Sequence, residues 1–130
     1  MTRREARILA MTILYTADFN GISIDNASKM VLEYEEESVN VFLDIVKKHE
    51  NEAMELINNS LVDYSISRLN LVDKAIIKLA TSELLEGKTE KTIIINEALE
   101  ITKEYSDHGD HKAVSFNNRL LDTISKNISK

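Results

Sequence analysis

The chain has 130 residues, of which 43% are hydrophobic and 29% charged, a balance that is typical of a globular protein and argues against disorder. It contains no cysteine, which excludes disulfides and thiolate metal sites and makes a reducing cytoplasm the expected location. Because the formal net charge is −6, any nucleic-acid site must be a local basic patch on an otherwise acidic protein.

Residues that break helices are rare, since the chain has no proline and three glycines. This scarcity favours long helices over a β fold with many turns. No apolar run is long enough for a transmembrane helix, and the first residues lack the pattern of a signal peptide. We therefore expect one all-helical domain over residues 1–130, long enough to bury a core.

Apolar residues recur at helical spacing in seven segments. Asn20-Gly21 and Glu86-Gly87 mark the ends of two helices, and the cations at residues 47–49 suit the end of another. The segment from residue 70 is apolar on nearly all sides, which predicts a central helix. The predicted helices cover about residues 2–18, 25–37, 38–49, 50–64, 70–86, 92–105 and 111–128.

Three stretches resemble the NusB transcription antitermination family in their order and spacing. They are RREAR from residue 3, running on to Tyr15; RLNLVDKAIIKLA from residue 68; and INEALEITK from residue 95, followed by FNN from residue 116. The resemblance covers essentially the whole chain. It implies an all-α fold of about seven helices in two small packed bundles.

The same resemblance implies a function. Family members bind boxA-type leader RNA of ribosomal RNA operons together with NusE, a small-subunit ribosomal protein, as part of the transcription elongation complex. It implies neither catalytic activity nor a cofactor. The chain departs from the family at Tyr64, where tryptophan is usual, and at Asn118-Arg119, where Asn-Gly is usual, and it lacks a proline before INEA. The change at Arg119 bears on contacts near the family's binding surface.

The predicted RNA site lies on the first helix. Arg3, Arg4 and Arg7 fall within an arc of about 100°, beside the apolar stripe, and Tyr15 lies farther along the side of Arg4. Guanidinium groups neutralise phosphates, and an aromatic ring can stack on an unpaired base. The alternative is a solvated first turn with a partly buried tyrosine.

Asp73 is the candidate partner contact. It aligns with an acidic residue of the family that resembles a contact with the protein partner. It is also the third residue of its helix, where a carboxylate interacts favourably with the helix dipole and takes part in capping. Both roles are compatible.

Two other constellations are interpreted as structural. The polar loop at residues 107–111 has residue types that bind metals, but we expect a solvated loop and no metal. Four residues have side chains that could take part in acid–base chemistry: Glu83, Asn96, Glu97 and Asn117. The sequence places no nucleophile or second base at a spacing that would pair with them. A helical protein-interaction module without RNA binding is the main alternative. An enzyme ranks third, because no Gly-rich loop or βαβ unit is present.

Overall fold

The computed structural model describes residues 1–62 and 65–128, and the regular structure in this part of the chain is entirely helical. The all-α prediction is confirmed. The helices are α1 (Arg3–Asn20), α2 (Ile24–Val31), α3 (Glu37–Ser60), the short 3-10 helix η1 (Ile66–Arg68), α4 (Leu71–Glu86), α5 (Lys91–Tyr105) and α6 (Lys112–Ile128). Tyr64, at the end of the fourth predicted helix, lies outside the described residues. None of these helices is long and apolar enough to cross a membrane.

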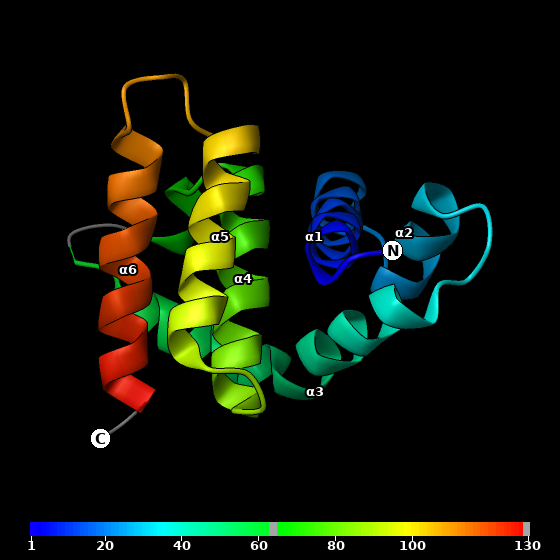
Figure 1. The fold of residues 1–130 in the computed structure, drawn as a ribbon, viewed down its shortest axis with the longest axis horizontal. Helices are drawn as coiled ribbons and strands as arrows, with labels where there is room; N and C mark the ends of the chain where they lie inside the picture. Colours follow the sequence, from blue (N-terminus) through cyan, green and yellow to red (C-terminus); the bar gives the residue numbers. More distant parts are fainter. Residues whose placement is uncertain (63–64, 129–130) are drawn as a thin grey trace.

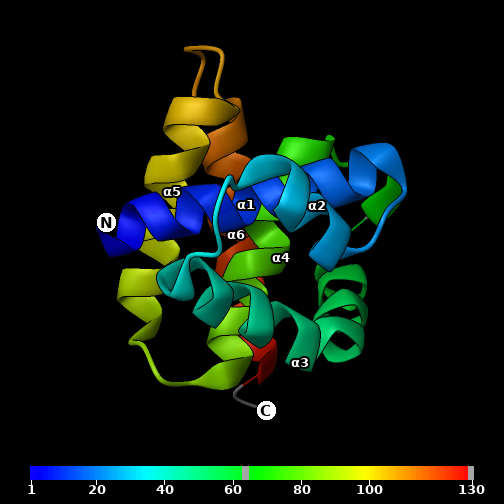
Figure 2. The same ribbon diagram turned by 90° about the vertical axis from the view of Figure 1, so that its right-hand side faces the viewer.

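The helices form two groups that share α3 (Figure 1). One group consists of α1, α2 and the first part of α3, and the other consists of α4, α5 and α6. The long α3 contacts α1 as well as α4 and α6, so it ties the groups together. Figure 2 shows α1 crossing in front of the upright α4 and α5. This crossing sets the first turn of α1 against α5.

Helix α4 occupies the centre of the fold, as its composition predicts. It contacts α1, α3, α5 and α6, and every residue from 75 to 83 is buried. A helix surrounded on all sides needs apolar residues on all sides, and α4 meets this need with alanine, isoleucine and leucine. Asn70 begins the helix by accepting a hydrogen bond from the backbone N–H of Asp73 at 2.8 Å.

The predicted break between residues 49 and 50 is wrong, because α3 is one helix of 24 residues. The cations that suggested a helix end make tertiary ion pairs instead. Lys48 Nζ and His49 Nε2 lie 2.9 and 3.0 Å from Glu86 Oε1, and Lys47 pairs with Asp25. Since no glycine or proline interrupts the segment, the helix continues through them.

Helix α2 is shorter than predicted and ends at Val31. Met30 and Tyr34, two apolar residues of the predicted helix over residues 25–37, are mostly exposed. The acidic run after Val31 explains the difference, because carboxylates are unfavourable at a helix C-terminus and favourable at an N-terminus. Glu36 and Glu37 accordingly stand at the start of α3.

Candidate nucleic-acid interface

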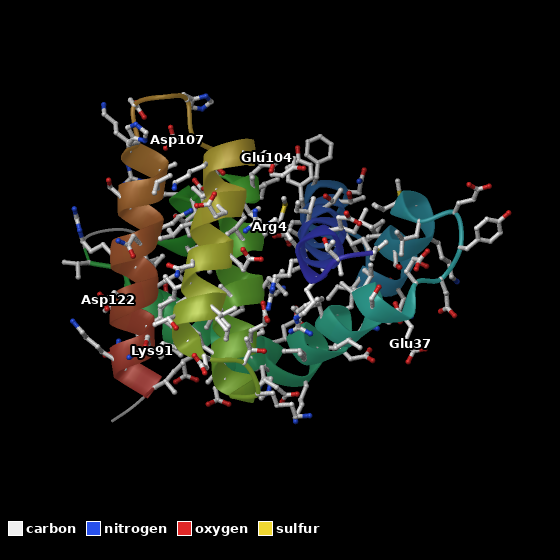
Figure 3. All side chains as sticks on the ribbon, in the orientation of Figure 1. Arg4, Glu37, Lys91, Glu104, Asp107 and Asp122 are labelled. Carbon is white, nitrogen blue, oxygen red and sulfur yellow. The ribbon has the colours of Figure 1, made fainter. Side chains whose placement is uncertain are left out.

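Arg4 lies in the first turn of α1 and reaches across to α5 (Figure 3). A capping box between Thr2 and Glu5 fixes the start of the helix. The Arg4 guanidinium donates to Glu97 Oε2 through Nε at 3.1 Å and Nη2 at 2.5 Å. These hydrogen bonds lower the pKa of the Glu97 carboxyl, against the effect of its partial burial, and raise the pKa of Arg4. The Arg4 side chain nevertheless remains 51% exposed.

Arg3 forms a looser set of contacts. Its Nη2 lies 3.4 Å from the hydroxyl of Thr89, in the connector between α4 and α5, and its Cζ lies 5.3 Å from the centre of the Phe42 ring. None of the ion pairs in the described part of the chain involves Arg3. Its positive charge is therefore available to a ligand without the loss of a carboxylate partner.

Arg7 does not lie beside the apolar stripe as predicted. It is 3% exposed, and its Nε and Nη2 donate to the two carboxylate oxygens of Glu83 at 3.0 and 2.8 Å. Its guanidinium also lies over the ring of Phe42, at 4.9 Å from the ring centre. A phosphate could reach Arg7 only by displacing this buried pair.

Tyr15 is partly buried and stacks on Phe19, with ring centres 5.9 Å apart and planes inclined by 16°. Both rings line a groove of about 340 Å³ that Tyr105, Ser106 and other residues complete. Phe19 is 66% exposed, and Tyr105 is also exposed. Sequence reasoning missed Phe19, although its spacing of four residues from Tyr15 on one helix could have indicated the pair.

Asp73 is buried beside this groove. Its Oδ1 accepts hydrogen bonds from Ser106 Oγ at 2.6 Å and from Asn117 Nδ2 at 3.1 Å. Asn117 Nδ2 also donates to Thr102 Oγ1 at 3.1 Å. The carboxylate thus joins α4 to α6 and to the end of α5, so Asp73 contacts the groove through Ser106 and presents little surface of its own.

Of the predicted site residues, Arg3, Arg4 and Tyr15 lie on α1 outside the core, whereas Arg7 is buried and Asp73 belongs to α4. Arg4 and Tyr15 stand about three turns and about 16 Å apart along the helix axis. Arg3 and Arg4 form a basic end, whereas Tyr15 and Phe19 form an aromatic end next to the Asp73 network. This arrangement suits an extended ligand with negative charges and flat rings.

Asp107, Glu83 and Glu97, three of the remaining candidates, have structural contacts. Asp107 Oδ1 accepts from the backbone N–H groups of Gly109 at 2.7 Å and His111 at 3.2 Å, which organises the loop between α5 and α6. No cluster of three or more potential metal ligands occurs within residues 1–62 and 65–128. Glu83 and Glu97 are both held by arginines.

The fold and this surface define a small all-helical protein with a basic and aromatic face along its first helix. The NusB family model matches residues 4–126, so the chain belongs to the NusB family. It is 31% identical to the transcription antitermination protein NusB of Staphylococcus aureus (strain MRSA252), over 97% of this chain and 100% of that protein.

Solved structures agree with this assignment. The chain is similar to T. maritima NusB with a TM-score of 0.84 and 27% identity, covering 97% of this chain and 92% of that one. It is also similar to a chain in the crystal structure of antitermination factors NusB and NusE in complex with double-stranded RNA. There the TM-score is 0.82, the identity is 27%, and 96% of each chain is covered.

Proposed function

We propose that the protein is a non-catalytic, RNA-binding transcription antitermination factor that acts in the cytoplasm. The observation that carries this proposal is the similarity, along nearly the whole chain, to a structure of NusB and NusE with RNA. The family match over residues 4–126 and the antitermination relatives support the same function.

The RNA contacts that we propose follow α1. Arg3 and Arg4 neutralise backbone phosphates, while Tyr15 and Phe19 offer stacked rings to an unpaired base. Arg7 contributes indirectly, because it is buried and its Nη1 lies 3.8 Å from Glu97 Oε1. The RNA that we propose is a boxA-type leader of a ribosomal RNA operon.

The protein partner that we propose is NusE, within the transcription elongation complex. The net charge of −6 favours association with a basic protein, mainly by speeding the encounter. Asp73 supports the partner surface by fixing Ser106 in the wall of the aromatic groove. We therefore propose that NusE binds at the part of the groove wall that Ser106 forms, beside the rings of Tyr15 and Phe19 that face the RNA, so the effect of Asp73 on NusE binding is indirect.

One observation favours the alternative, a protein-interaction module that binds no RNA. Arg4 and Arg7 already have carboxylate partners in Glu97 and Glu83. If these pairs persist in the presence of RNA, Arg3 alone remains to neutralise phosphate.

Titration of boxA-type and scrambled RNA, each with and without NusE, distinguishes the two functions. We expect RNA binding that favours the boxA-type sequence, strengthens with NusE and weakens steeply with salt. Absence of RNA binding under low salt, together with intact NusE binding, would establish the interaction module instead.

A double variant with Arg3→Ala and Arg4→Ala tests the surface itself. It should weaken RNA binding and reduce the salt slope by roughly one unit per lost phosphate contact. The matched control replaces Lys112 and Lys126 of α6 by alanine, which removes the same charge far from α1. Equal losses in both variants would mean that only net charge matters and that the basic end of α1 is not the RNA site.

A further inference from the structure

Helix α5 turns an acidic face toward the basic end of α1. Glu97, Glu100 and Glu104 are spaced three and four residues apart, so they share one side of the helix. All three act electrostatically on Arg4 and raise its pKa, Glu97 most strongly through its hydrogen bond. Figure 3 shows Arg4 and Glu104 in the space between α5 and α1. The exposed arginine of the proposed RNA surface thus faces a row of carboxylates.

Glu97 resembles a bound phosphate in the way it meets Arg4. Its carboxylate accepts three hydrogen bonds from one guanidinium, from Nε to Oε1 at 3.3 Å and from Nε and Nη2 to Oε2 at 3.1 and 2.5 Å. These are the N–H donors with which an arginine binds a phosphate group. Glu97 is itself fixed, since its side chain is 19% exposed and Arg7 lies on its other side. Arg7 in turn is anchored by Glu83 in the core. The acceptor is therefore held in place before any ligand arrives.

We propose that Glu97 is an intramolecular competitor of RNA that lowers the RNA affinity of the basic end of α1 by occupying Arg4. This inference rests on the proposed RNA binding at α1. An incoming phosphate must displace Glu97 from Arg4, and the displaced carboxylate then lies near the bound phosphate. Because phosphates carry no sequence information, the competition lowers the binding affinity for all RNAs by the same factor.

The test measures RNA affinity of the full chain carrying Glu97→Gln, which keeps the shape and removes the charge. BoxA-type and scrambled RNA should both bind more tightly, by the same factor of about five. This factor corresponds to the upper end of the strength of ion pairs with an exposed partner. A variant that unfolds would bind RNA more weakly, so tighter RNA binding by Glu97→Gln cannot result from loss of the fold. Glu97→Asp keeps the charge but moves it away from Arg4, because the side chain is shorter. It should give a smaller gain in RNA affinity, and it replaces Glu97→Gln in the test if that variant folds poorly.

Two controls separate displacement at Arg4 from a general effect of charge. Glu100→Gln removes the same charge from α5, but Glu100 pairs with Lys103, so its gain should be clearly smaller. In an Arg4→Ala background, Glu97→Gln should give no gain, because no contact is left to release. An equal gain in that background, or an equal gain from Glu100→Gln, overturns the competition at Arg4.

The outcomes also distinguish failure of the competitor role from failure of the proposed RNA binding. If the unmodified protein binds RNA and neither Glu97 variant binds more tightly, only the competitor role fails. If neither the unmodified protein nor Glu97→Gln binds RNA, both proposals fail. Binding by Glu97→Gln alone supports the competitor role and shows that Glu97 blocks RNA binding at Arg4 in the unmodified chain.

Discussion

Arg7 and Glu83 form a buried ion pair with two hydrogen bonds, and each side chain is only 4% exposed. The pair joins α1 to α4, and the stacking of Arg7 on Phe42 extends the link to α3. Both side chains also border a small, mainly apolar cavity, so few other polar groups lie near the pair. An arginine that the sequence assigns to RNA binding is thus a structural element of the core.

The first prediction follows from this burial. Arg7→Ala should lower the free energy of unfolding by about 3–5 kcal/mol, because Glu83 would keep a buried charge without a partner. Urea denaturation measures the change. The double variant Arg7→Met, Glu83→Leu removes both charges and should be clearly more stable than Arg7→Ala. If the two variants are equally destabilised, lost packing and not the unpaired charge explains the effect.

Helical periodicity predicted most of the helices, because the local sequence determines where a helix forms and where it ends. Helix α4 is apolar all round and lies at the centre, and Gly21 and Gly87 end α1 and α4 with positive φ. Periodicity cannot reveal a partner far along the chain, and Glu83 stands 76 residues from Arg7. The same limit applies to α3, where the cations beside His49 suggested a helix end but pair with distant residues.

The candidate site could be predicted in part for the same reason. Arg3, Arg4 and Tyr15 occupy one helix, so their common side follows from spacing alone. The groove beside Tyr15 combines the ends of α1 and α5 with the start of α4, and its far wall includes Tyr105. Only the packing of three helices brings these parts together, so spacing could have indicated Phe19 but not Tyr105.

The second prediction concerns acid stability. The hydrogen bond from Lys48, followed by that from His49, lowers the pKa of Glu86 from 4.5 to about 2. Since the folded pKa is depressed, these contacts stabilise the fold above about pH 4.5, and their contribution is lost as the pH falls through about 2. Glu86→Gln should therefore be less stable than the unmodified chain at neutral pH, and the difference should shrink across that window.

Chemical denaturation at a series of pH values measures this difference. Glu52→Gln is the matched control, since Glu52 is an exposed carboxylate that takes part in none of the described ion pairs. It should change stability little at any pH. A stability difference for Glu86→Gln that stays constant down to pH 2 would mean that the charge of Glu86 does not contribute.

The third prediction separates two roles of Asp73. Asp73→Ala removes the acceptor of Ser106 and Asn117 and should lower the free energy of unfolding by about 1–3 kcal/mol. Asp44→Ala, at an exposed site of α3, should have a much smaller effect. If Asp73 also supports NusE binding by fixing Ser106 in the wall of the aromatic groove, NusE affinity should fall under conditions where the variant is fully folded. Unchanged NusE affinity with a lower melting temperature would assign Asp73 to the fold alone.

The fourth prediction concerns the aromatic end of the proposed RNA surface. Phe19→Ala should weaken RNA binding by about 1–3 kcal/mol if the ring stacks on a base. Its stability should change little, because Phe19 is 66% exposed. Tyr34→Ala is the matched control, since Tyr34 is an exposed aromatic residue on the connector after α2 and lies outside the groove. Its RNA affinity should equal that of the unmodified chain.

The salt dependence of Phe19→Ala identifies the kind of contact that is lost. Stacking releases no counterions, so the slope of affinity against salt should stay unchanged while the affinity falls. Arg3→Ala should do the opposite and reduce the slope by about one unit, since it removes a phosphate contact. Tyr15→Phe should be mild, because it keeps the ring that stacks on Phe19. A reduced slope in Phe19→Ala would indicate that losing the ring removes phosphate contacts at the basic end of α1, and the proposal of base stacking at Phe19 would then be wrong.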